Sequence, residues 1–204
     1  MRLIAEGLAA LRGERIVFRN VNFEIASGQA LILHGPNGSG KTTLLRIVAG
    51  LLSIMAGRLR LTDNEDRSVN GEARDRMVHF VGDQDSVRSQ LRVRETLRFH
   101  AALLGAPARD VDAALASWGL APLANDSGGL LSAGQRRRLS LARLSLQTRG
   151  LWLLDEPLVA LDVASRAHLN SVCNKHLADG GLIVAASHEP FLAGSRTLRL
   201  GSHA

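Results

Sequence analysis

The sequence predicts an α/β protein whose core is a mainly parallel sheet flanked by helices, with an antiparallel β lobe and an inserted helical lobe. Alternating apolar and polar residues over 21–25 are typical of a strand with one face in water, as in an antiparallel sheet. Helical spacing over 93–104 and 110–118, the second closed by Gly119, predicts helices. Three other apolar runs, at residues 30–33, 151–154 and 182–186, lack this alternation. Such runs are typical of strands that helices cover on both faces, as in a parallel sheet.

The chain length is suited to one compact domain. It has 204 residues, of which 46% are hydrophobic, enough for a substantial core divided into two lobes. We expect a single domain over 1–204, with the helical lobe at about 86–147 and a surface connection at the polar stretch 63–75. The N-terminal residues lack the pattern of a signal peptide, and no apolar run approaches the roughly 18 to 20 residues that span a bilayer.

Charge and cysteine content say less about function. The formal net charge of +6 is compatible with an anionic partner, but aromatic residues are only 3%, which leaves little material for stacking on bases. We therefore expect no nucleic-acid partner. The single cysteine, Cys173, cannot form an internal disulfide. Its helical spacing with Leu169, Val172 and Leu177 favours a buried core residue over a reactive thiol.

A phosphate-binding loop is predicted between the strand that ends at His34 and a helical run that starts near Leu44 and closes at Gly50. Glycines in such a loop let backbone N–H groups turn toward a polyphosphate, and the following helix adds its positive end. Lys41 supplies a charge for the β- and γ-phosphates, and Thr42 offers a hydroxyl to Mg²⁺. The predicted nucleotide-binding residues are Gly35, Pro36, Asn37, Gly38, Ser39, Gly40, Lys41, Thr42 and Thr43.

Polar residues follow three of the predicted strands, at the edge where ligands gather in open α/β sheets. Asp155 is expected to hold Mg²⁺, directly or through water, and Glu156 to polarise a water for attack on the γ-phosphate; both could instead cap a helix. His188, after the strand 182–186, is a candidate for ordering that water, or a structural histidine. Gln84, after the strand-like residues 78–81, is a candidate Mg²⁺ ligand and water contact.

A serine and a glycine, Ser132 and Gly134, precede a helical run that continues to Leu144. A helix start of this kind can bind an anion, although most serine-glycine turns are ordinary N-caps. One chain has one triphosphate to bind, so a second phosphate site predicts a dimer in which each copy caps the ATP of the other. The consecutive arginines 136–138 point to different sides of a helix and favour a solvated face over a nucleic-acid patch.

In their order along the chain, these motifs resemble the nucleotide-binding subunits of ABC transporters over nearly the whole length. The resemblance implies Mg-ATP hydrolysis, a homodimer in which Ser132, Gly134 and Gln135 act on the partner's ATP, and docking of an integral membrane permease near Gln84. It also implies a peripheral location on the cytoplasmic face of the bacterial inner membrane. The residues that carry the resemblance are 35–43, Gln84, 131–135, 151–156, 159–162 and His188.

Within the family, the small size, Leu-Ser-Ala-Gly-Gln at 131–135 and the strand leading to Pro157 are similar to subunits of c-type cytochrome biogenesis. That similarity implies haem export or release of a haem-loaded chaperone. Two positions depart from the family pattern: Arg12 stands where an aromatic residue usually stacks on adenine, and Val159 where many relatives have a hydroxyl residue. The alternatives are a different ABC transporter, or an ABC ATPase acting on nucleic acid, whose usual coiled-coil insertion or second ATPase domain is absent from this sequence.

Overall fold

The computed structural model describes residues 1–83, 87–146 and 149–201. The chain divides into two compact units. The first unit comprises Met1–Gly82, Arg149–Pro157 and Cys173–Ala204, and the second comprises Asp83–Thr148 and Leu158–Val172. Sheets occur in the first unit, and the second is helical.

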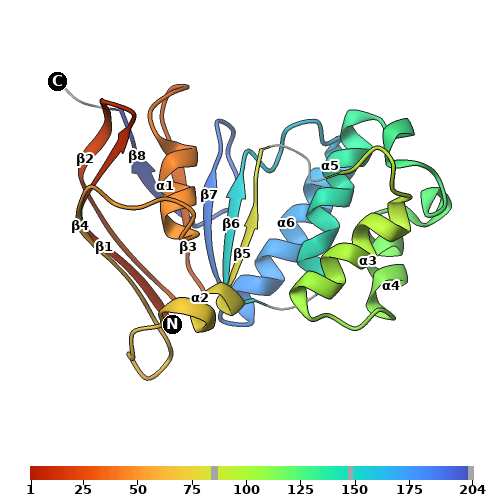
Figure 1. Ribbon diagram of the computed structural model, residues 1–204, viewed down its shortest axis with the longest axis horizontal. Helices are drawn as coiled ribbons and strands as arrows, with labels where there is room; N and C mark the ends of the chain where they lie inside the picture. The colour runs from red at the N-terminus through yellow and green to blue at the C-terminus, as the bar shows by residue number, and fades with distance from the viewer. Residues whose placement is uncertain (84–86, 147–148, 202–204) are drawn as a thin grey trace. The chain divides into compact units, whose positions relative to one another are not determined.

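The first unit contains two sheets, as predicted. A five-stranded parallel sheet has the order β5-β6-β7-β3-β8, and a three-stranded antiparallel sheet has the order β2-β1-β4 (Figure 1). The three apolar runs of the sequence form β3, β6 and β7. All residues of these strands are buried except His34, the last residue of β3, which is partly exposed. The strands are β1 (Arg2–Arg12), β2 (Arg15–Ala26), β3 (Ala30–His34), β4 (Ala56–Thr62), β5 (Val78–Val81), β6 (Leu151–Asp155), β7 (Leu182–Ala186) and β8 (Arg196–Arg199).

Helix α1 (Lys41–Val48) lies between these two sheets (Figure 1). Its apolar residues share one core cluster with side chains from both sheets. Full burial of each large apolar side chain contributes about 1.5 to 3 kcal/mol, so the position of the helix start is held firmly. The cluster includes Leu44, Leu45 and Val48 of α1, Leu3, Phe18 and Ile25 of the antiparallel sheet, and Leu33, Leu153 and Val184 of the parallel sheet.

Strand β1 was not evident from the sequence pattern. Its pairing with β2 shifts register between Ala5 and Leu8, between Leu8 and Ala10, and again before Leu11. Each shift moves the following side chains relative to the two faces of the sheet, so the alternation of burial over residues 2–6 does not continue along the strand. The prediction therefore captured the antiparallel lobe only through part of β2.

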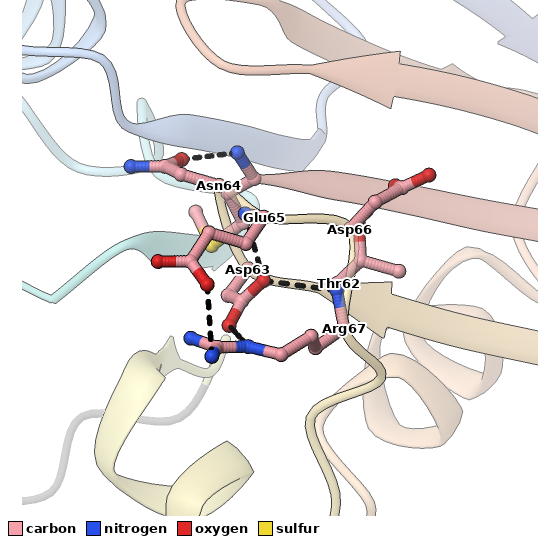
Figure 2. Close-up of polar contacts among 7 residues, drawn as sticks. Thr62, Asp63, Asn64, Glu65, Asp66 and Arg67 are labelled. Atoms are coloured by element: carbon pink, nitrogen blue, oxygen red, sulfur yellow. Dashed lines mark hydrogen bonds and ion pairs between the residues drawn. The ribbon is translucent and has the colours of Figure 1, made fainter.

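The stretch 63–75 is a turn in its first half and a helix in its second. The Asp63 carboxylate accepts hydrogen bonds from the N–H groups of Glu65 and Arg67 and from Arg67 Nε, each at 2.9 Å (Figure 2). The bonds from Arg67 hold the pKa of Asp63 below its usual value. Helix α2 (Gly71–Met77) follows, so residues 71–75 lie on the surface, as expected, but are helical. Because α2 has no buried residue, its sequence carries no apolar period.

The second unit contains α3 (Val93–Leu104), α4 (Asp110–Ser117) and α5 (Ala133–Ala142), and α6 (Val163–Ala178) begins in it. Gly119 adopts φ 65° just beyond α4, which confirms the predicted helix end. The core of the unit contains Trp118, whose indole N–H donates to Ser145 Oγ at 3.1 Å. In the described ranges, no helix is both long enough and apolar enough to cross a bilayer.

Two expectations about individual side chains have different outcomes. Arg137 of α5 is only 3% exposed, so the expectation of a solvated face over residues 136–138 is wrong for this arginine. Arg143 is buried nearby, and burial, with the charge of Arg137, lowers its pKa to about 10. Cys173 is fully buried and its pKa is raised to about 12 by burial, which confirms the core residue predicted for it.

Candidate functional site

The predicted phosphate loop connects β3 to α1 in the first unit. Gly40 has no room for a side chain, because a Cβ there would lie 2.6 Å from Val17 Cγ1 and 2.9 Å from Phe18 Cδ1. Among the residues that the structure describes, no side chain caps the start of α1, and the first turn of this helix contains no acidic residue. Its backbone N–H groups and positive end are therefore suited to an anion.

Lys41 is buried at the first position of α1 and turns back over the loop. Its ammonium group donates to the carbonyl oxygens of Gly35, at 2.7 Å, and Pro36, at 3.2 Å. The positive charge is thus held directly at the loop that the sequence assigns to phosphate. A buried ammonium is costly without acceptors, and these two carbonyls supply them.

The ends of β6 and β7 bring the predicted acids and the histidine to the same edge of the parallel sheet. Asp155, the last residue of β6, is 1% exposed and lies opposite Ala186, the last residue of β7. Glu156 follows with its N–H donating to the Ala186 carbonyl at 3.0 Å. Its φ of 46° is uncommon for a residue other than glycine, and backbone strain of this kind clusters at functional sites.

His188 joins the loop to the acid. Its Nε2 lies 3.2 Å from Glu156 Oε1, 3.1 Å from Asn37 Oδ1 and 3.2 Å from Lys41 Nζ. A protonated Nε2 donates to Glu156 or Asn37, whereas an unprotonated Nε2 accepts from Lys41, so one nitrogen cannot satisfy all three at once. The structure therefore brings three predicted residues, Asn37, Lys41 and Glu156, to the imidazole of a fourth, His188. This ring can exchange hydrogen-bond partners among them.

Two of the three predicted Mg²⁺ ligands, the Asp155 carboxylate and the Thr42 hydroxyl, belong to described residues of the first unit. Both are hard oxygen ligands, which suit Mg²⁺, and Mg²⁺ is commonly held by one or two protein groups together with substrate phosphates. No group of three or more His, Cys, Asp or Glu side chains capable of holding a metal occurs in the ranges that the structure describes. The third predicted ligand, Gln84, lies outside the described residues.

The predicted second anion site is in the second unit, at the start of α5. Ser132 is the N-cap: its Oγ accepts from the Gln135 N–H at 3.2 Å, and Gln135 Oε1 accepts from the Ser132 N–H at 2.8 Å. The ordinary capping role expected as an alternative is therefore present. A Cβ on Gly134 would lie 2.8 Å from the Ala160 carbonyl oxygen, so this glycine allows α5 to contact the turn at 158–162.

The structure adds a hydrogen bond of Asp162 that the sequence analysis did not predict, and it shows where Arg12 lies. Asp162 Oδ1 accepts from the Ser165 N–H at 2.8 Å, and the hydrogen bonds from Ser165 lower the pKa of Asp162. An aspartate three residues before a serine, ahead of a helical run, is the signal that could have revealed this bond. Arg12, the candidate adenine contact, is exposed at the end of β1, where it pairs with Arg15.

Comparisons with known proteins point to one class. The family described as "ABC transporter" matches residues 18–159. The chain is 44% identical over 204 residues to "Cytochrome c biogenesis ATP-binding export protein CcmA" of Rhodopseudomonas palustris (strain BisB5), covering 100% of both chains. The protein of that name from Rhizobium meliloti (strain 1021) is 42% identical, with 98% of each chain covered. A solved structure titled "Putative ABC transporter (ATP-binding protein) from Pyrococcus furiosus" has a TM-score of 0.81 at 25% identity, with 98% of each chain covered.

Proposed function

Because the chain belongs to the ABC transporter family, as one of its ATP-binding ATPase subunits, we propose that it powers a membrane complex of c-type cytochrome biogenesis. The two CcmA-named relatives reported above align with 98% and 100% of this chain, at 42% and 44% identity. Haem export and release of a haem-loaded chaperone are the two outputs that this assignment allows. The CcmA names support this role, and the ATP site supplies its chemistry.

The loop residues 35–43 hold the triphosphate of ATP, with Lys41 beside the β- and γ-phosphates. Asp155 and Thr42, together with Gln84, hold Mg²⁺, which when bound neutralises phosphate charge. Glu156 orients a water and accepts its proton as the water oxygen bonds to the γ-phosphorus and the bond to the bridging oxygen breaks, releasing ADP and phosphate. His188 positions Glu156 and the γ-phosphate, which its contacts at 3.1 to 3.2 Å with Asn37, Lys41 and Glu156 support.

The working form is a homodimer in which Ser132, Gly134 and Gln135 of one copy close on the ATP of the other. The exposure of Ser132 at the start of α5 supports this arrangement. Large apolar side chains are also exposed near Ser132 in the sequence, in the turn that Gly134 contacts and at the first residue of α6, as expected of a surface that a partner covers. These are Leu130, 80% exposed, Val159, 58%, and Val163, 85%.

Arg12 stacks on the adenine through its planar guanidinium, in place of the usual aromatic ring. The partner in the membrane is an integral permease similar to CcmB, which would hold the ATPase dimer on the cytoplasmic face of the inner membrane. Both statements rest on the family resemblance and on the relatives' names.

The observation that carries the catalytic proposal is the convergence of Asn37, Lys41, Glu156 and His188 around one imidazole nitrogen. Glu156→Gln removes the proton acceptor while keeping the side chain size. We expect turnover to fall by at least about 100-fold and a dimer to accumulate with Mg-ATP in size-exclusion chromatography. The matched control is Glu72→Gln on α2, whose carboxylate is 88% exposed and should leave both results unchanged. Wild-type turnover in Glu156→Gln would contradict the assignment.

The biological role has a separate test. A bacterium lacking its own CcmA is complemented with this chain, and covalent haem in c-type cytochromes is measured by haem staining. We expect the wild-type chain to restore staining, and Glu156→Gln and Lys41→Ala to fail. If the purified wild-type chain hydrolyses ATP but restores no cytochrome, while the host's own gene does, the role in cytochrome biogenesis is wrong and the ATPase assignment stands.

A further inference from the structure

The chain segment that follows β8 lies directly against the phosphate loop. Leu200 N–H donates to the His34 carbonyl at 2.8 Å, which continues the pairing of β8 with β3 up to the first residue of the loop. A Cβ on Gly35 would lie 2.4 Å from the Leu200 carbonyl oxygen. The two backbones therefore touch with no side chain between them.

Gly201 makes the second contact. A Cβ at this position would lie 2.9 Å from Ser39 Cβ and 3.5 Å from Pro36 Cδ, and the first distance is shorter than real Cβ contacts allow. Ser39 is 7% exposed and its Cβ is fixed to the backbone of the loop, so it cannot rotate away. The φ of Gly201, 86°, is also one that favours glycine.

Open space adjoins the same contact. A cavity of about 520 Å³ is lined on one side by His34, Gly35 and Pro36 and on the other by Thr197, Arg199, Leu200 and Gly201. Beside this open space, the backbone contacts of Leu200 and Gly201 join the loop to the segment that follows β8. A loop that binds phosphate through its N–H groups needs those groups to keep their direction, because hydrogen bonds weaken steeply as they bend.

We propose that the turn at Leu200 and Gly201 sets the position of the phosphate loop, and that Gly201 is a positioning residue for nucleotide binding. The inference rests on the proposed role of residues 35–43 as the triphosphate site. Gly201 does not touch the phosphates itself. It acts by allowing the chain to pass close enough to hold Ser39 and Pro36 in place.

The test compares two glycine substitutions that share the same backbone cost. Gly201→Ala adds a Cβ against Ser39, whereas Gly194→Ala adds one at φ 77° with nothing within 4 Å. We expect Gly201→Ala to weaken ATP binding about tenfold by titration calorimetry, and Gly194→Ala to change it by less than about twofold, since small misplacements of binding groups have large effects. Thermal unfolding without nucleotide gives the stability that each variant loses, and ATP binding is compared at a temperature where both are folded, which separates positioning from a general loss of stability.

A rescue variant tests the contact between an added Cβ at position 201 and Ser39 Cβ directly. Ser39→Gly removes the atom that the new Cβ would meet, so adding Gly201→Ala in that background should weaken ATP binding by less than about twofold. If Gly201→Ala alone fails to fold, recovery of folding in this double variant to the level of Ser39→Gly alone supports the contact, and failure of the double variant to fold while Ser39→Gly folds overturns it. Equal weakening by Gly194→Ala and Gly201→Ala, or no weakening by Gly201→Ala, also overturns it.

The same titrations separate this inference from the proposed function. Lys41→Ala should lose ATP binding whether or not the turn acts on the loop. Loss in Lys41→Ala with unchanged affinity in Gly201→Ala removes the positioning role alone. Unchanged affinity in Lys41→Ala removes the phosphate site, and the positioning role with it.

Discussion

Gly181, between α6 and β7, is the position where a single added methyl group has the clearest predicted cost. A Cβ there would lie 2.2 Å from His176 Cε1 and Nε2 and 2.6 Å from Cδ2. The imidazole is 4% exposed, stacks on Trp152 with ring centroids 3.8 Å apart and 4° between the planes, and has Nε2 3.2 Å from the Leu182 carbonyl oxygen. Gly181→Ala therefore requires a buried, stacked ring to move.

The magnitude follows from two opposing effects. Alanine in place of glycine restricts the unfolded chain, which stabilises the fold by about 0.4 to 1 kcal/mol where the backbone is compatible. Overpacking a buried site costs about 1 to 3 kcal/mol, and contacts at 2.2 Å with two ring atoms belong near the upper end of that range. We expect the free energy of unfolding to fall by about 2 kcal/mol.

Urea unfolding at pH 8, where His176 is neutral, measures this loss in the wild-type and His176→Ala backgrounds. Without the imidazole ring, the added methyl group has space, so Gly181→Ala should cost nothing further or recover part of the loss. The reasoning is refuted if Gly181→Ala is as stable as the wild type, or if its cost is the same in both backgrounds.

Two further predictions concern buried titratable groups. Burial lowers the pKa of His176 below its ordinary 6.5, so the unfolded chain binds a proton at higher pH than the native chain does. The free energy of unfolding should thus stay level above pH 6.5 and decrease as the pH falls below it, and His176→Ala should reduce that decrease in urea titrations across this range. Burial raises the pKa of Cys173 to about 12, so its thiol should react with a disulfide reagent slowly in the native protein and at the rate of a model thiol in denaturant; fast native labelling contradicts this.

The sequence analysis did not predict strand β1, helix α2 or the burial of Arg137. Register shifts in β1 removed the alternation by which a strand is recognised, and α2 buries no residue that could mark a helical period. Arg137 sits in a run of three arginines, yet only the packing of the second unit decides that this one is buried. Composition gives no reason to separate it from its neighbours.

Elements with local signals could be predicted from the sequence alone. The apolar runs of β3, β6 and β7, the phosphate loop before Lys41 and the cap at Ser132 depend on residues within a few positions of each other, so they can be read along the chain. Folding brings His188 to Asn37, 151 positions away, and Gly201 to Ser39, and neither contact could be predicted from the sequence. Contacts of this kind depend on the order and register of strands in the sheet, and the sequence of a single strand does not fix either one.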